Sequence, residues 1–140
     1  MTRIWIHLII CSNASFLQED NVNWDSAKAE IIKLALQNNI VINTINGTSN
    51  HLHFIIWLGE KQTINEVIDQ LKRISIDSLL NHKLIDIHFR WIDDYLALSV
   101  SDLLLELEKH CITTQPKYHQ TKELKDEISF ILNESKINYE

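Results

Sequence analysis

Residues 50–58 read Asn-His-Leu-His-Phe-Ile-Ile-Trp-Leu, a run in which two histidines alternate with large apolar residues. Its β-branched and aromatic residues predict a strand. Because successive side chains of a strand point to opposite faces, the apolar residues at even positions are predicted to face a core. His51 and His53 then share the other face with Trp57. Two imidazoles two residues apart on one face can bind a single metal ion, although two ordinary half-exposed sheet residues give the same pattern.

Outward from this strand, strands and helices follow one another in a recognisable order. Strands are predicted at Ile4–Cys11, Ile40–Ile45, His51–Leu58 and Ile85–Trp91, and helices from Asp25 to about Asn38 and from Thr63 to about Leu80. Between the second and third strands, Asn46-Gly47 predicts a turn. The order β-α-β-β-α-β is the split βαβ, or ferredoxin-like, arrangement. It is an α+β fold with an antiparallel sheet and two helices on one face.

The C-terminal part of the chain adds further elements. Tyr95–Val100 is either a short fifth strand or an extended linker. Ser101 is placed to cap a helix from Asp102 to about Thr113, and a last amphipathic helix is predicted from about Glu123 to Asn133. Two helices cover only one face of the sheet. The other face must therefore be covered by a partner chain, by these C-terminal helices or by a ligand.

Composition limits the classes of function. The chain has 140 residues, of which 45% are hydrophobic and 23% charged, and this predicts one globular domain over residues 1–140. A formal charge of -6 argues against broad non-specific duplex binding, although a local basic groove remains compatible with it. Cys11 and Cys111 are too few for a disulfide scaffold or a four-cysteine zinc module. No stretch is long enough to span a membrane, and the apolar N-terminal run is interpreted as a strand rather than a secretion signal. A cytoplasmic protein is predicted.

Several separated motifs carry a resemblance to a known family. Residues 42–53 read Ile-Asn-Thr-Ile-Asn-Gly-Thr-Ser-Asn-His-Leu-His. This stretch resembles the HUH motif region of the single-tyrosine transposases of small bacterial insertion sequences and of the related REP-associated enzymes. The helix that follows also fits the family, and Phe89-Arg90-Trp91-Ile92-Asp93-Asp94-Tyr95 is similar to its Trp-x-x-Gly-Tyr segment. Finally, Cys111-Ile112-Thr113-Thr114-Gln115 stands where the family has Tyr-Ile-x-x-Gln.

The resemblance implies a metal centre and a nucleophile. His51 and His53 match two histidine ligands of a divalent ion, usually Mg²⁺ or Mn²⁺, and Gln115 matches the third ligand. Such an ion acts as a Lewis acid on the scissile phosphodiester. The family nucleophile is a tyrosine four residues before the glutamine, a spacing that puts both side chains on one face of a helix. In this chain that position is Cys111.

The cysteine departs from the family pattern and predicts that strand cleavage is lost or severely impaired. A thiolate is a poor nucleophile toward a phosphodiester, and cysteine is also shorter than tyrosine. Tyr118 and Tyr95 are the alternative nucleophiles that the sequence offers. Asp94 replaces the family's turn glycine, and the loop at residues 12–15 lacks the basic residues that are common in the family.

The expected partners also follow from the resemblance. It implies binding of single-stranded or hairpin DNA and a homodimer in which strand pairing joins two sheets. The candidate DNA contacts are Trp57, Lys72, Arg73, Lys109 and Lys117. Three hypotheses stay open: a transposase-family protein acting on hairpin DNA with impaired cleavage, a non-catalytic DNA-binding regulator, and a ferredoxin-like interaction module that binds no nucleic acid.

Overall fold

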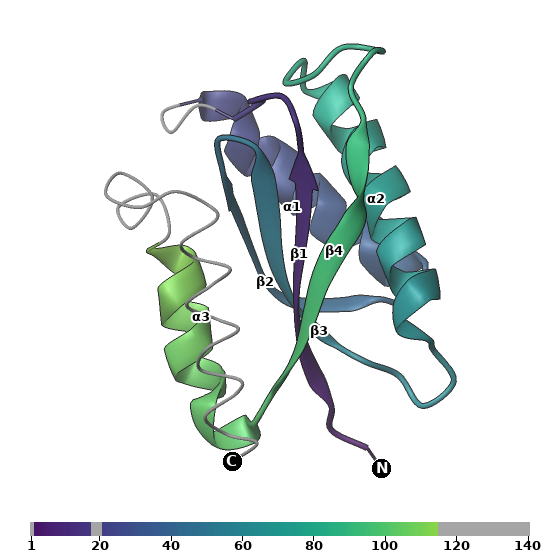
Figure 1. The fold of residues 1–140 in the computed structure, drawn as a ribbon, viewed down its shortest axis with the longest axis vertical. Coiled ribbons are helices and arrows are strands. Elements are labelled where there is room, and N and C mark those ends of the chain that lie inside the picture. The colour runs from purple at the N-terminus through teal and green to yellow at the C-terminus, as the bar shows by residue number, and fades with distance from the viewer. Residues whose placement is uncertain (1, 18–20, 115–140) are drawn as a thin grey trace.

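The computed structural model describes residues 2–17 and 21–114, which form one antiparallel sheet with helices on both faces (Figure 1). The strands are β1 (Trp5–Ser12), β2 (Val41–Thr48), β3 (His51–Trp57) and β4 (Trp91–Val100). The helices are α1 (Val22–Gln37), α2 (Ile64–Asn81) and α3 (Leu105–Thr113), the last preceded by a 3₁₀ turn at Asp102–Leu104. The sheet order is β2-β3-β1-β4, which confirms the ferredoxin-like arrangement. The helix predicted at Glu123–Asn133 lies outside the described residues.

The main core lies between the sheet and the helices α1 and α2. The even positions of β1 and β3 face these helices, as strand alternation predicts. The fully buried core side chains include Leu8, Ile10, Leu52, Phe54, Ala27, Ile31 and Leu71. None of the helices in the described part of the chain has the length and apolar character to cross a lipid bilayer.

Both long helices begin at capped residues. The side chain of Asn21 accepts a hydrogen bond from the backbone N–H of Asn23 at 2.9 Å. Thr63 and Glu66 form the capping box that their spacing suggests, in which Thr63 Oγ1 accepts from the backbone N–H of Glu66 at 3.2 Å. Caps of this kind stabilise a helix by about 1 kcal/mol.

A polar cluster on Glu30 joins α1 to the end of α2. Asn81 Nδ2 donates to one carboxylate oxygen of Glu30 at 2.9 Å, and His82 Nε2 lies 2.6 Å from the other. The hydrogen bond from Asn81, together with the nearby His82, holds the pKa of Glu30 below its usual value against the opposing effect of burial. The cluster therefore fixes the two helices side by side through an ionised carboxylate.

The turn between β2 and β3 does not lie at Asn46-Gly47. Those residues pair within the sheet, Asn46 with His53 and Gly47 with Leu52, and the chain reverses at Ser49 and Asn50 instead. Ser49 adopts the positive φ of 32° that the tight reversal demands. Gly47 serves close packing, because a Cβ there would lie 2.5 Å from Leu52 Cδ2 and 2.9 Å from the backbone oxygen of His51.

The strand predicted at Ile85–Trp91 is also wrong. Residues 85–90 form the loop after α2, which turns where Phe89 N–H donates to the backbone oxygen of Asp86 at 3.1 Å. β4 begins only at Trp91 and includes Tyr95–Val100, so the supposed fifth strand is the body of the fourth. Phe89 of this loop is buried because it packs edge-on against Trp91 and Phe16, at ring-centroid distances of 4.9 and 5.1 Å. A packed aromatic loop thus imitates a strand in sequence.

The second face of the sheet is covered by α3, on the opposite side from α1 and α2 (Figure 1). The short connection through the 3₁₀ turn brings α3 back across β2 and β3. Of the coverings that the sequence left open, a C-terminal helix is the one that the described residues show. The side chains beneath α3 are those at the odd positions of β1 and β3, including both histidines of the candidate site.

Candidate functional site

Three imidazoles are buried on the sheet face beneath α3. His51 and His53 of β3 are 1% and 0% exposed, and His7 of the neighbouring strand β1 is 5% exposed. The rings of His51 and His53 lie with centroids 4.8 Å apart, and those of His7 and His53 with centroids 5.1 Å apart. The histidines are thus not half-exposed sheet residues. They form a compact cluster that we call the histidine face.

Hydrogen bonds order this cluster. His7 Nε2 lies 2.9 Å from His53 Nδ1, and His51 Nδ1 lies 3.1 Å from the side-chain oxygen of Asn50. On its other side, His7 Nδ1 lies 3.2 Å from Glu108 Oε2 of α3. Burying polar rings is unfavourable unless they are hydrogen-bonded, and a sheet face that only had to be covered could use apolar residues. The cluster therefore points to a function rather than to packing.

The C-terminal end of α3 is fixed beside the histidines. Asn46, which pairs with His53 across the sheet, donates from Nδ2 to the backbone oxygens of Ile112 and Thr113 at 3.0 and 3.5 Å. Ile112 is the inward residue of this turn and is 1% exposed. The chain thus leaves α3 next to the histidine face. Gln115, the predicted third metal ligand, follows Thr114 directly but lies outside the described residues.

The donor set of the histidine face fits a divalent ion only in part. Across residues 2–17 and 21–114, no three His, Cys, Asp or Glu side chains are placed to share a metal ion. His51 and His53 provide two imidazoles, and any further ligand must be of another residue type or lie outside the described chain. An amide oxygen in that role would complete a nitrogen and oxygen set that suits Mn²⁺ or Mg²⁺.

Cys111 is exposed on α3, one residue before the buried Ile112. It is therefore not a buried packing residue, in contrast to Cys11 on β1, which is buried. Partial burial raises the pKa of the Cys111 thiol, and the negative charge of Glu108 raises it further. Because thiolate is the nucleophilic form, this environment holds Cys111 in its less reactive state at neutral pH.

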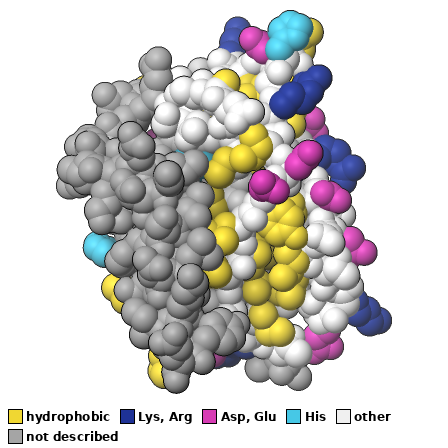
Figure 2. All heavy atoms as spheres, viewed as in Figure 1, with side chains coloured by type: hydrophobic (Ala, Val, Ile, Leu, Met, Phe, Trp, Pro, Cys, Tyr) yellow, Lys and Arg dark blue, Asp and Glu magenta, His cyan; other side chains and the backbone are white. Residues whose placement is uncertain are grey.

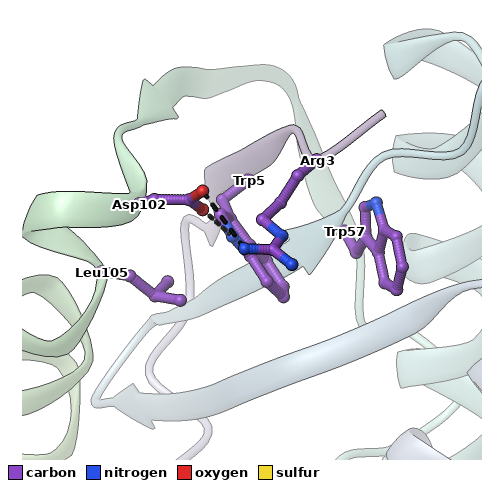
Figure 3. A pocket seen from close by; sticks show the side chains of 5 residues that line it. All are labelled: Arg3, Trp5, Trp57, Asp102 and Leu105. Atoms are coloured by element: carbon purple, nitrogen blue, oxygen red, sulfur yellow. Dashed lines mark hydrogen bonds and ion pairs between the residues drawn. The ribbon is translucent and has the colours of Figure 1, made fainter. Parts of the chain in front are cut away.

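A pocket of about 320 Å³ opens on the same side of the sheet, near the start of α3 (Figure 3). It is lined by Arg3, Trp5, Trp57, Asp102 and Leu105. Trp5 and Trp57 are cross-strand partners whose ring centroids lie 6.0 Å apart with an interplanar angle of 43°. Trp57 lies on the strand that carries the histidines, four residues from His53, which is a distance of about 13 Å along a strand.

Polar contacts fix the edges of the two indoles. Trp5 Nε1 donates to Asp102 Oδ1 at 2.8 Å, and the guanidinium of Arg3 lies 3.6 Å from the other carboxylate oxygen. Trp57 Nε1 donates to the backbone oxygen of Thr2 at 3.2 Å, and its ring is 36% exposed. The pocket therefore offers aromatic surface beside a guanidinium, with the indole N–H groups already bonded.

The predicted basic contacts are not gathered on the histidine face. Lys72 and Arg73 belong to α2, in the opposite layer, where Lys72 Nζ donates to the backbone oxygens of Ile92 and Asp93 at 3.0 and 3.2 Å. They line a separate groove of about 440 Å³ between α2 and β4. Lys109 is half-buried on α3. Lys117 and Tyr118 lie outside the described residues.

Sequence analysis missed three members of the site: His7, Asn46 and Glu108. His7 is the one polar side chain inside the apolar run of β1, a signal that gains meaning only once β1 is known to lie beside β3. Asn46 was assigned to a turn. Glu108 is one of several charged residues on its helix, and no local pattern distinguishes it.

Comparisons with known proteins agree with this fold. The sequence model of a transposase family described as IS200-like matches residues 1–115. A candidate transposase from Deinococcus radiodurans R1 is 19% identical, with a TM-score of 0.59 over 82% of this chain and 92% of that one. A REP-associated tyrosine transposase bound to a REP hairpin is 15% identical, with a TM-score of 0.58 over 84% of this chain and 68% of that one. No curated protein sequence matches significantly.

Proposed function

The chain belongs to the IS200-like transposase family, and from that premise we propose that it binds single-stranded hairpin DNA on the side of the sheet that carries the histidine face, while its own strand cleavage is impaired. The observation that carries the proposal is the hydrogen-bonded cluster of buried imidazoles beside the end of α3. The hairpin-bound relative with the same fold supports DNA as the partner.

A divalent ion would be held by His51, His53 and Gln115. The two imidazoles lie together on β3, and Asn46 of the neighbouring strand holds the backbone oxygens of Ile112 and Thr113 at the end of α3. When bound, Mg²⁺ or Mn²⁺ supplies Lewis-acid stabilisation of charge on a phosphodiester. The contribution of the chain itself is to keep two neutral ring nitrogens and one helix end in a fixed arrangement.

Cys111 limits the chemistry. Its thiol has a raised pKa, so little thiolate is present at neutral pH, and sulfur attacks phosphorus poorly. Binding without cutting is the consequence, and this makes a non-catalytic DNA-binding role the second candidate function. The net charge of -6 is also compatible with an interaction module that binds no nucleic acid. A failed binding experiment would indicate that function.

Contacts with the DNA are proposed at the pocket of Trp5 and Trp57. Exposed aromatic rings give stacking surfaces for unpaired bases, and a guanidinium adds attraction to the backbone. The pocket lies at the start of α3, and the histidine face lies beneath its middle and end on the same side of the sheet, which suits an extended DNA strand along this side.

A homodimer through β4 is part of the proposal. Within the described part of the chain β4 is an edge strand that pairs with β1 alone, so one side of its backbone is available for pairing. Figure 2 shows apolar side chains gathered in a strip on the β4 side of the molecule, and Ile92, Leu96, Leu98 and Val100 of that strand are only half-buried. A second copy of the chain is the occupant that would extend the sheet.

The test combines binding with cleavage. A pool of stem-loop oligonucleotides with randomised single-stranded flanks, and an unstructured oligonucleotide of equal length, are titrated at two salt concentrations with Mn²⁺. We expect salt-sensitive binding that favours the stem-loops, and no covalent adduct on a denaturing gel. Cys111→Tyr is expected to form an adduct, and the further substitution His53→Ala is expected to remove it again.

Two results would contradict the proposal. An adduct formed by the unmodified chain would show that another residue, such as Tyr118, acts as nucleophile, and peptide mapping would identify it. Absence of binding to every oligonucleotide at low salt would favour the interaction module. The Cys111→Tyr variant alone tests only whether the rest of the cleavage machinery survives.

A further inference from the structure

We propose that Glu108 and His7 are positioning residues that set the tautomer of His53, so that its Nε2 nitrogen carries the lone pair. The three side chains form a chain from α3 through β1 to β3, with links of 3.2 Å from Glu108 to His7 and 2.9 Å from His7 to His53. The part of this inference that concerns a metal rests on the proposed function, whereas the tautomer itself does not.

The direction of the chain follows from which atoms can donate. A carboxylate only accepts hydrogen bonds, so the ring nitrogen of His7 that faces Glu108, Nδ1, must carry a proton. In a neutral imidazole the other nitrogen, Nε2, is then an acceptor. His53 Nδ1 faces that acceptor and must be the donor. The proton of His53 therefore lies on Nδ1, which leaves Nε2 as its basic nitrogen.

His51 is held in the same tautomer by a different hydrogen bond. Its Nδ1 lies 3.1 Å from the side-chain oxygen of Asn50, and an amide oxygen only accepts. Both rings of the pair thus present Nε2, the arrangement in which a metal-binding histidine keeps its other nitrogen on a hydrogen-bond acceptor. Only the hydrogen-bond chain that ends at His53 includes a residue from α3.

This difference couples His53 to the helix that carries Cys111. Glu108 is 38% exposed, so its hydrogen bond with neutral His7 is exchanged readily for one with water and contributes little to folding stability. Its effect is local instead. When α3 is docked on the sheet, His7 is fixed in one tautomer and His53 follows. Without Glu108, Nδ1 of His7 need not carry the proton, so His7 Nε2 can either donate to His53 or accept from it. His53 is then no longer held in one tautomer.

The first test reads the tautomers in the metal-free protein by ¹⁵N–¹H correlation of labelled histidines at about pH 8, above the ordinary histidine pKa of ~6.5. We expect His7 and His53 each to show one tautomer, with the proton on Nδ1. Glu108→Ala should convert His53 into a mixture, whereas Glu108→Gln, which keeps an oxygen acceptor, should preserve the single form. Glu106→Ala, a change of the same kind at an exposed position of α3, is the matched control.

A proton on Nε2 of His53 in the unmodified chain would overturn the inference, because His7 would then be donating to His53. Identical spectra for Glu108→Ala and Glu106→Ala would overturn it as well. Unfolding curves of the three variants should nearly coincide, which separates a positioning role from a structural one.

The second measurement is Mn²⁺ affinity by titration calorimetry. Loss of a residue that orients a ligand typically weakens metal binding by roughly tenfold or more. We expect that loss for Glu108→Ala and none for Glu106→Ala. If the unmodified chain binds no Mn²⁺ while the tautomers are as stated, the metal part of the proposed function fails and the positioning of His53 stands. If Mn²⁺ binds equally in both variants, the positioning role toward the metal is refuted.

Discussion

Neighbouring side chains on the two faces of β3 are buried equally but have opposite chemistry. Phe54 and His53 are neighbours on β3 and both are 0% exposed, yet Phe54 enters an apolar core beneath α1 and α2, while His53 joins a polar network beneath α3. Burial of an apolar side chain stabilises the fold, whereas burial of an imidazole is unfavourable unless its ring nitrogens are hydrogen-bonded. The difference teaches that burial alone does not identify a core.

The largest effect expected from this comparison is on stability. Phe54→Ala should lower the free energy of unfolding by about 3–5 kcal/mol, because it leaves a cavity in a close-packed core. The double substitution His7→Leu with His53→Leu should change it by only about 1 kcal/mol, since both partners of a buried hydrogen bond are replaced by apolar groups of similar size. Urea unfolding followed by circular dichroism measures both.

If the double substitution proved as damaging as Phe54→Ala, the histidine face would be a structural core and the comparison would break. A control for the remaining carboxylate is Glu108→Gln in the doubly substituted chain, which removes a charge without a partner. This third change should leave the unfolding curve almost unmoved, because Glu108 is open to water on one side.

A smaller effect is expected at the pocket lined by Trp5 and Trp57. Trp57→Ala should weaken binding of a stem-loop with single-stranded flanks by about 1–3 kcal/mol, the usual contribution of one stacked base. Trp57→Phe should recover most of the loss, because it keeps an aromatic surface. Fluorescence anisotropy with a labelled oligonucleotide measures the affinity.

Ile87 provides the matched control for that substitution. It is 75% exposed in the loop before β4, and Ile87→Ala removes an exposed apolar side chain without touching the pocket. An equal loss of affinity in both variants would show that Trp57 has no special part in DNA binding. The side of the sheet covered by α1 and α2 would then be as good a candidate for the DNA-binding surface as the side that carries the histidine face.

The smallest expected effect concerns the reactivity of Cys111. Since the pKa of its thiol is raised, the thiolate fraction at a given pH is below that of a free cysteine, and the rise of alkylation rate with pH should be displaced upward. Glu108→Gln should move the profile part of the way back, because one of its two causes is removed. Iodoacetamide labelling followed by mass spectrometry gives the rates, with Cys111→Ser as the blank.

The helices, most of the strands and the faces that they turn toward the core could be predicted from sequence, because these features depend on local rules. Alternation along β3 separates Phe54 from His53, and the capping box marks the start of α2. The failures arise where tertiary packing overrides those rules. Asn46-Gly47 imitates a turn although the glycine is needed for close approach to Leu52, and an aromatic loop before Trp91 imitates a strand.

The residues of the site also differ in whether local rules could identify them. His51 and His53 could be identified because they stand two residues apart on one strand. His7 is 46 positions from His53 along the chain, and Glu108 is further away still. They meet the histidine pair only through strand order and the return of α3. No spacing rule connects such positions. Gln115, which the family resemblance alone suggested, remains a prediction.

Gly47 carries a consequence for natural variation. Any β-carbon at this position would press on the backbone oxygen of His51, which cannot swing aside as a side chain can. Homologues that abandon catalysis would thus be free to exchange their imidazoles for aliphatic residues long before they could alter this glycine. Among homologues that keep the fold but have lost catalysis, we expect the histidines to be substituted first and Gly47 to be among the last residues to change.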